Sequence, residues 1–380
     1  MNSERARKGC ESRVSLLGFS MDKIIDFSEC QDGMSTYGGS DHKISIVYND
    51  EKYMLKFPEV KTKYNNLQTS HVNNVFSEYI GSHIMQSLGL QAHDTLIGLY
   101  KDEPVVACKD FNGNGYRLQE FGDLLLNLYR PDEIGRIPTY DQIQTVIETH
   151  PRLHNCVEEA KEAYWETIVG DALIGNFDRH KNNFGYLVNE ETRDVRPAPI
   201  YDCGSSLYPN LSEEGMKQIM DSHEAIAKRI YVFPAIALNM NNDIKHPEKA
   251  RYYDFLSSNY DETCTKALYK IQPKISMEKI HSIVNNTPMI SETRKEFYNY
   301  ILDIRKSAII DHALSNLLMQ DIGPIDQFKE YIIDDRYFDI GRQQIDKETS
   351  DIQHEIQHTE EHTTQKVYNY NKTDYGYNNR

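Results

Sequence analysis

A ten-residue segment from Gly175 to Phe184 combines a carboxylate and an amide at a fixed spacing. Asp178 and Asn183 stand five positions apart, between an apolar stretch expected to be helical and a stretch expected to be a strand. Transfer of a phosphoryl group needs a carboxylate that accepts the proton of the attacking hydroxyl and an oxygen ligand for Mg²⁺ nearby. This loop supplies both groups. A polar loop that merely ends a helix would have the same composition, so the pair alone leaves both interpretations open.

The following segment is expected to bring a second carboxylate to the same place. Residues 184–200 read as two strands around a polar loop, and the prolines of the second strand predict an edge position. A hairpin brings its open ends together, so Asn183 and Asp202 become neighbours although they are nineteen residues apart. An amide oxygen and a carboxylate beside Asp178 form a hard-oxygen site that suits Mg²⁺. The Asp-Cys-Gly that begins at Asp202 has the Asp-x-Gly form of the kinase metal-binding motif.

A lysine and a glutamate further upstream have the types that a phosphate clamp needs. Lys56 lies in an apolar strand, where an unpaired lysine is costly to bury. The next expected helix carries Glu78 at the edge of its buried stripe. An ion pair between such residues aims the lysine at nucleotide phosphates. For either residue alone, a solvated side chain is the competing interpretation.

Two further segments have compositions that suit nucleotide binding. The first segment, residues 38–43, contains two glycines that let the backbone approach phosphate oxygens, which amide N–H groups can hold. This segment matches neither GxGxxG nor GxxxxGK[ST], so an ordinary hairpin turn competes with that interpretation. The second segment, 105–111, joins the strand-rich part to the rest and can offer backbone groups to an adenine ring, with Asp110 near the ribose. The first segment comprises Gly38, Gly39, Ser40, Asp41, His42 and Lys43.

The elements that position these residues change in character along the chain. A four-residue spacing of apolar residues predicts a helix over 73–88, and Asn49-Asp50 predicts a hairpin turn. Alternation predicts strands over 43–48, 53–57, 95–100 and 105–108. Beyond residue 111, apart from the hairpin at 184–200, the sequence predicts helices over 116–129, 139–150, 156–175, 212–231, 262–271, 276–285 and 290–319.

The chain is expected to divide into four parts. A disordered lead spans 1–23, and Met21 is as good a start residue as Met1. The N-lobe spans 24–110 and the C-lobe spans 111–338. A disordered tail rich in Gln, His, Thr, Asn and Tyr spans 339–380, because it has too few aliphatic residues to offset the entropy of ordering.

Composition and charge narrow the classes of function. The 380 residues include 42 basic and 58 acidic side chains, and the net charge of −16 disfavours direct binding of nucleic acid. No apolar run is long enough to span a membrane, so no membrane span is expected. The six cysteines include no CxxC pair, so neither a zinc ribbon nor a redox dithiol is indicated. The expected location is cytoplasmic, and secretion without a signal peptide is the alternative.

The chain resembles the HipA-like serine/threonine kinases, in a compact form of that family. The similarity extends over residues 24–315 and includes the segments KISIVYNDEKYMLKFP and LIGNFDRHKNNFGYL. It implies an α+β, bilobed protein-kinase-like fold, with a small antiparallel β N-lobe that holds one helix and a larger, mostly helical C-lobe. The resemblance rests on Gly39, Lys43, Lys56, Glu78, the loop Asp178-Arg179-His180-x-x-Asn183 and the segment Tyr201-Asp202-x-Gly204.

The resemblance also implies cofactors and roles for the candidate residues. ATP and Mg²⁺ would be the cofactors, and a protein with a serine or threonine acceptor would be the substrate. Asp178 would be the catalytic base. Asn183 and Asp202 would hold the metal, and Lys56, paired with Glu78, would hold the phosphates.

The rest of the nucleotide site is implied in the same way. The backbone at Ala107 and Lys109 would contact adenine, and His180 would complete the ATP site together with Asp110 and the glycine-rich loop. HipA-like kinases can autophosphorylate a hydroxyl just upstream of this glycine-rich loop. Thr36 best matches that position, and Ser35 is the second candidate.

The favoured hypothesis is an ATP- and Mg²⁺-dependent protein serine/threonine kinase, with two alternatives. A small-molecule or lipid kinase uses the same metal and base chemistry on another hydroxyl. A non-catalytic pseudokinase would act as a binding module. Retention of Lys56, Asp178, Asn183 and Asp202 argues against the pseudokinase, because a scaffold has no chemical need for all four.

Overall fold

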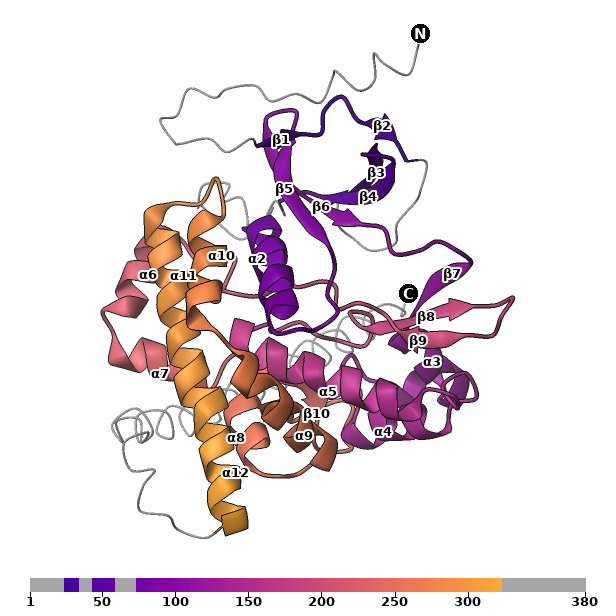
Figure 1. Cartoon of the computed structure of the whole chain (residues 1–380). Coiled ribbons are helices and arrows are strands. Elements are labelled where there is room, and N and C mark those ends of the chain that lie inside the picture. The colour runs from indigo at the N-terminus through magenta and orange to yellow at the C-terminus, as the bar shows by residue number, and fades with distance from the viewer. Residues whose placement is uncertain (1–23, 34–42, 59–72, 323–380) are drawn as a thin grey trace, which may run out of the picture.

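The computed structural model describes residues 24–33, 43–58 and 73–322 (Figure 1). These residues form a small lobe built on a sheet and a larger lobe that is mostly helical, which agrees with the expected α+β fold. The expected boundary at residues 110 and 111 stays a prediction, and the lead at 1–23 and the tail at 339–380 lie outside the described residues. Within the described ranges, no helix is both long and apolar enough to cross a membrane.

Six strands form the sheet of the small lobe, in the order β1-β5-β6-β4-β3-β2. Neighbouring strands run antiparallel except for β1 and β5, which run parallel. Asn49 and Asp50 connect β3 and β4 with φ angles of 50° and 63°, as a two-residue type I′ hairpin requires. The expected hairpin is therefore confirmed. The strands are β1 (Ile25–Asp26), β2 (Gln31–Asp32), β3 (Lys43–Tyr48), β4 (Glu51–Lys56), β5 (Thr95–Tyr100) and β6 (Glu103–Lys109).

The sheet buries side chains on both of its faces, because successive residues of a strand point to opposite sides. In β6, Ala107 belongs to a small core inside the lobe, whereas Cys108 belongs to the large core on the other face. Lys56 follows Met54 on the face of β4 that meets the large core. The small core comprises Phe27, Ile46, Tyr53, Leu55, Phe57, Val105 and Ala107.

Helix α2 (Asn74–Ser87) lies between the sheet and the helical lobe (Figure 1). It contacts β5 and β6 on one side and α10 (Met277–Asn286) and α5 (Val157–Ile174) on the other. The absence of a side chain at Gly81 allows α2 to lie close to Cys203, since a Cβ at Gly81 would lie 2.7 Å from Cβ of Cys203. The helix is followed by Gly89 at a φ of 77°, a left-handed conformation that commonly ends helices. This packing fixes α2 relative to both lobes.

The larger lobe is organised around α5, which is buried along most of its length. Trp165 of α5 stacks on Phe255 with ring centroids 5.3 Å apart. The expected helix near 290–319 is present as one run that changes to π-helical geometry over Lys306–Asp311. Helices α4 (Tyr140–Thr149), α9 (Glu262–Ile271) and α11 (Glu292–Arg305) contact α5, and the same lobe contains α8 (Tyr252–Ser257), α10 and α12 (His312–Ile322).

A second, three-stranded sheet lies in the larger lobe, in the order β7-β8-β9. The expected hairpin within 184–200 is confirmed as β8 (Gly185–Asn189) and β9 (Val195–Pro197), and β9 is an edge strand as its prolines predict. The expected helix over 116–129 is wrong in its first part. Residues there form β7 (Tyr116–Glu120) before α3 (Phe121–Leu128), because β7 pairs with β8 along its whole length.

One other expectation for the larger lobe is wrong, and two of its strands were missed. The helix expected over 212–231 is two helices, α6 (Glu213–Met220) and α7 (His223–Tyr231). The break occurs because the side chain of Ser222 accepts the N–H of Ala225 and begins a new helix. Strands β10 (Ala235–Asn239) and β11 (Lys249–Arg251) were not expected. β10 is a short, fully buried run with no strand period to detect, and β11 has only three residues, two of them charged.

Candidate active site

A cleft of about 630 Å³ lies between the two lobes. Elements β3, β4, β6 and α2 line it from the small lobe, and the loops before β8 and after β9 line it from the larger lobe. Ala107 and Lys109 do not belong to its lining. The candidate residues that line it are Lys43, Lys56, Glu78, Asp110, Asp178, His180, Asn183 and Asp202. The candidates outside the described residues are Ser35, Thr36, Gly38, Gly39, Ser40, Asp41 and His42.

Lys56 makes two ion pairs in this cleft. Its Nζ lies 3.1 Å from Oε2 of Glu78, as the sequence predicts, and 3.0 Å from Oδ1 of Asp202. Burial by itself would lower the pKa of Lys56, but the negative charges of Asp202 and Glu78 outweigh burial and raise the pKa well above its ordinary value. Lys56 therefore stays protonated and presents a positive charge to the cleft.

Asp202 is held by both members of the Lys56–Glu78 pair. Burial would raise the pKa of Asp202, but the charge and hydrogen bond of Lys56 lower it to about 2. The N–H of Asp202 donates to Oε1 of Glu78 at 3.1 Å. Its φ of 60° is in the left-handed region, which a non-glycine residue adopts at a cost in energy and which is common at functional sites. The side chain is 40% exposed, so it can contact a ligand in the cleft.

The loop before β8 presents Asp178 and Asn183 to the same cleft. The N–H of Asp178 donates to Oδ1 of Asn176, and Nδ2 of Asn183 donates to the carbonyl of Asp178 at 2.7 Å. Because the amide nitrogen of Asn183 is engaged, its Oδ1 is the atom that can bind a cation. The Asp178 carboxylate is 37% exposed, 3.8 Å from Arg136 Nη2 and 3.9 Å from His180 Nε2.

Arg179 connects the two loops, a role that was not predicted. Its Nε and Nη2 donate to the carboxylate of Asp171 on α5 at 2.8 and 3.1 Å. Its Nη1 donates to the carbonyls of Asn183 and Tyr201. Burial opposes the charge, but Asp171 outweighs burial and raises the pKa of Arg179 well above its ordinary value. Because one guanidinium binds both ends of the β8–β9 hairpin, it sets the spacing between Asn183 and Asp202.

Aromatic and apolar side chains that were not predicted line another part of the cleft. The rings of His93 and Phe111 lie 4.8 Å apart, and those of Phe111 and Tyr201 lie 5.8 Å apart. The backbone of Lys109 is engaged within the protein, since its N–H donates to the carbonyl of Asp94 and its carbonyl contacts Nε2 of His93. The aromatic rings give the cleft flat surfaces that suit a planar base.

The donor atoms of the site determine which cation fits it. The carboxylate of Asp202 and Oδ1 of Asn183 are hard oxygen ligands from opposite ends of one hairpin, and both line the cleft. Mg²⁺ binds through one or two such groups and completes its shell with water and phosphate oxygens. The pair therefore fits Mg²⁺ together with a phosphorylated ligand.

Comparisons with known proteins agree with this chemistry. The family described as "HipA-like C-terminal domain" matches residues 35–288. Serine/threonine-protein kinase CtkA of Helicobacter pylori is 39% identical over 295 residues, which cover 76% of this chain and 87% of that protein. The crystal structure of a Helicobacter pylori proinflammatory kinase CtkA aligns with a TM-score of 0.72 and 37% identity, over 80% of this chain and 99% of that chain. This chain therefore belongs to the HipA-like serine/threonine kinase family.

Proposed function

We propose that this chain transfers the γ-phosphoryl group of ATP to a serine or threonine of a protein substrate. The family and the name of its relative CtkA support the reaction class. The observation that carries the assignment to this cleft is the contact of Lys56 with both Glu78 and Asp202, in a cleft that Asp178 and Asn183 also line. Phosphoryl transfer needs this combination of clamp, base and metal ligands.

Each residue has a distinct part in the proposed reaction. Asp178 accepts the proton of the acceptor hydroxyl as that oxygen attacks phosphorus. Lys56, oriented by Glu78, binds the phosphate oxygens. Asn183 and Asp202 hold Mg²⁺, which when bound neutralises part of the charge on the phosphates.

The proposed nucleotide contacts extend to other residues of the cleft. Lys43, Asp110 and His180 line it and are proposed to contact ATP, as is the glycine-rich loop ahead of β3. The proposed contacts of adenine with the backbone of Ala107 and Lys109 would compete with the bonds that Lys109 makes to Asp94 and His93.

The catalytic proposal is tested with labelled ATP, Mg²⁺ and a cell lysate. Asp178→Asn keeps the size of the side chain but removes the proton acceptor, so we expect transfer to protein to fall by roughly 10²–10⁴ while ATP binding stays within a few-fold. Asp141→Asn, at an exposed position of α4, is the control and should keep full activity. Unchanged transfer by Asp178→Asn would exclude this base. Label in lipid or metabolites alone would favour a small-molecule kinase, and no label would favour a pseudokinase.

The metal proposal is tested by thermal shift with ATP, with and without Mg²⁺. Asn183→Ala and Asp202→Ala should both lose part of the Mg²⁺-dependent stabilisation, because a ligand that binds only the folded state raises the melting temperature. Asp202→Ala should lose more, since a full negative charge is removed. If both variants respond as the wild type does, the metal is bound elsewhere.

We also propose that the kinase modifies itself at Thr36 or Ser35, which lie outside the described residues. A phosphate there carries about −1.5 to −2 charges, which would repel the phosphates of ATP and inactivate the enzyme. Intact-mass measurement after incubation with Mg²⁺ and ATP decides this. Wild type should gain one phosphate, and Ser35→Ala/Thr36→Ala should gain none.

The proposed partner is a protein, without direct binding of nucleic acid. The net charge of −16 supports this restriction. The proposed location is the cytoplasm, and secretion without a signal peptide is the alternative. Fractionation of cells that express the tagged chain distinguishes the two.

A further inference from the structure

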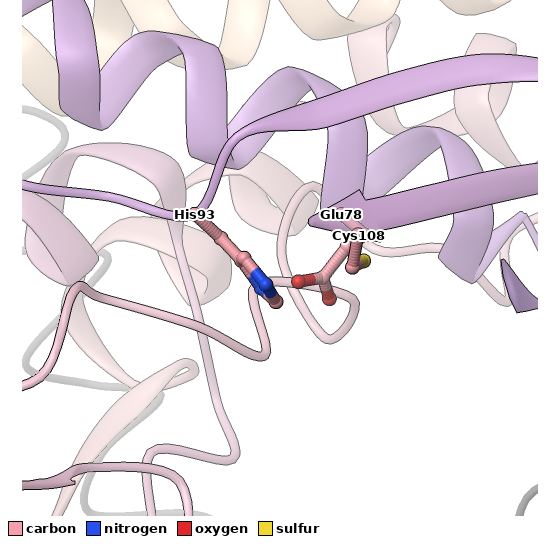
Figure 2. A group of neighbouring side chains, drawn as sticks. All are labelled: Glu78, His93 and Cys108. Carbon is pink, nitrogen blue, oxygen red and sulfur yellow. The ribbon is translucent and has the colours of Figure 1, made fainter. Parts of the chain in front are cut away.

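Glu78, His93 and Cys108 form a compact cluster within the small lobe (Figure 2). A carboxylate oxygen, a ring nitrogen and the thiol sulfur of these residues all lie within 4.8 Å of one another. The three residues come from α2, from the segment before β5 and from β6, so three separate elements converge. All three are buried and all three line the cleft, through which an ion can reach them.

The orientation of His93 supports a role as a metal ligand. Its Nε2 lies 2.6 Å from the carbonyl of Lys109, which can only accept, so Nε2 carries the proton. Nδ1 is then the unprotonated nitrogen of a neutral ring, and it is buried without a hydrogen-bond partner among the described residues. Burial lowers the pKa of His93, which favours the neutral ring. A metal-binding histidine typically uses one nitrogen for the ion while the other donates to a carbonyl or carboxylate.

We propose that Glu78, His93 and Cys108 bind a Zn²⁺ ion, at a site separate from the Mg²⁺ site proposed at Asn183 and Asp202. Zinc binds thiolate sulfur, imidazole nitrogen and carboxylate oxygen, often with three protein ligands and one water. Mg²⁺ prefers oxygen ligands alone, so the two sites select different ions. When zinc binds, the Cys108 thiol loses its proton to solvent and the sulfur forms the bond to the ion.

This zinc ion would compete with Lys56 for Glu78. The Lys56 ammonium already lies 3.1 Å from Oε2 of Glu78, and a divalent cation on the same carboxylate would repel it. Each cation therefore weakens the binding of the other, which is a reciprocal coupling. If the cleft has the proposed kinase function, zinc would disturb the phosphate clamp and inhibit transfer. That consequence rests on the proposed function, whereas the metal site itself does not.

The test uses Co²⁺ as a spectroscopic substitute for Zn²⁺ on the full chain, with a reductant that lacks thiols. A thiolate ligand gives Co²⁺ a near-ultraviolet charge-transfer band, which imidazole and carboxylate ligands do not give. In the wild type, we expect this band to saturate at one equivalent of Co²⁺ per chain and to disappear when Zn²⁺ is added. Cys108→Ala should lose the band. Cys264→Ala, which removes another buried thiol, should keep it.

Two more variants test the geometry without depending on Cys108→Ala to fold. His93→Gln retains a donor toward Lys109 but removes Nδ1, and it should weaken zinc binding by at least about 100-fold, more than the loss of an outer hydrogen bond costs. Lys56→Met removes the competing charge and should tighten binding by about tenfold or more, because one neighbouring charge shifts proton affinity by one to three pKa units.

Several results would overturn the proposal, and none depends on phosphoryl transfer. They are no thiolate band in the wild type, a band that survives Cys108→Ala, and zinc affinities of His93→Gln and Lys56→Met equal to that of the wild type. Histidines at 354, 358 and 362, outside the described residues, can bind Co²⁺ but cannot produce a thiolate band. A failure here is therefore separate from a failure of the kinase proposal.

Discussion

Lys56 and Arg179 are two buried cations beside the same cleft, but the protein binds them in different ways. Arg179 forms a two-point contact with Asp171 and also donates to two backbone carbonyls. Among the residues that the structure describes, Lys56 forms ion pairs with two carboxylates, those of Glu78 and Asp202. The planar guanidinium suits a permanent, directional contact, whereas the ammonium is a point charge that can exchange partners.

The ion pairs of Arg179 and Lys56 also differ in exposure to solvent, and this difference supports the same distinction between a permanent and an exchangeable contact. The side chains of Arg179 and Asp171 are 1% and 0% exposed, so this pair is closed to solvent and ligands. Asp202 is 40% exposed and can turn from Lys56 to a metal ion without opening the core. We infer that the Arg179 pair maintains the geometry of the site and that the Lys56 pairs take part in its chemistry.

The largest effect on stability is expected when the closed pair is broken. Arg179→Met leaves Asp171 as a buried carboxylate without a counter-charge, which should cost about 3–5 kcal/mol of the free energy of unfolding. Urea denaturation measures this cost. The double variant Arg179→Met/Asp171→Asn removes the unpaired charge and should recover part of it. A loss below about 1 kcal/mol for Arg179→Met would contradict the structural role of this pair.

Replacing the other cation should affect the reaction more than stability. Lys56→Met should lower phosphoryl transfer by roughly 10²–10³, as the loss of one preorganised electrostatic contact to a transition state does. Its cost in unfolding free energy should be smaller, about 1–3 kcal/mol, because water can hydrate the 40% exposed Asp202 and the buried Glu78 still accepts the N–H of Asp202. Urea denaturation and single-turnover transfer measure the two quantities. A stability loss equal to that of Arg179→Met would show that the two cations have equivalent roles.

The ion pair between Lys56 and Asp202 should also make the free energy of unfolding depend on pH. Because Lys56 lowers the pKa of Asp202 to about 2, below the ordinary value near 3.9, the ionised form stabilises the folded state. This stabilisation is complete above about pH 4 and is lost as the pH falls toward 2. It should amount to about 1 kcal/mol, since the exposed carboxylate is screened by solvent. The difference in unfolding free energy between wild type and Asp202→Asn should therefore shrink as the pH falls from 5 toward 2, and a constant difference would exclude this contribution.

The two cations also differ in how far the sequence predicts them. The Lys56–Glu78 contact follows from the order of elements, a strand and then a helix with one charged residue at the buried edge of each. The Arg179–Asp171 contact was missed although a signal was present. Asp171 stands within an apolar helix, where a buried carboxylate requires a cation.

The cluster of Glu78, His93 and Cys108, where we propose a zinc site, was missed for a different physical reason. His93 and Cys108 come from separate elements, and spacing along the chain does not show that they meet. Their approach depends on a parallel bridge between Ala92 and Ile200 and on the pairing of β5 with β6. Such long-range contacts follow from the packing of the whole sheet, whereas the hairpin that carries Asn183 and Asp202 is local and was predicted correctly.

Replacement of Arg136 should have the smallest effect on the free energy of unfolding, and it serves as the exposed reference for the two buried cations. Its guanidinium lies 3.8 Å from Oδ1 of Asp178, and its side chain is 85% exposed. An exposed ion pair gains little in water and is screened by salt, so Arg136→Ala should change the unfolding free energy by no more than about 0.5 kcal/mol. Urea denaturation of wild type, Arg136→Ala and Arg179→Met at one salt concentration places all three on one scale. A cost for Arg136→Ala that approaches the cost for Arg179→Met would mean that burial does not set the contribution of a cation here. A negligible cost would support burial as the property that separates Arg179, which holds the site together, from the exposed Arg136, which only lies beside it.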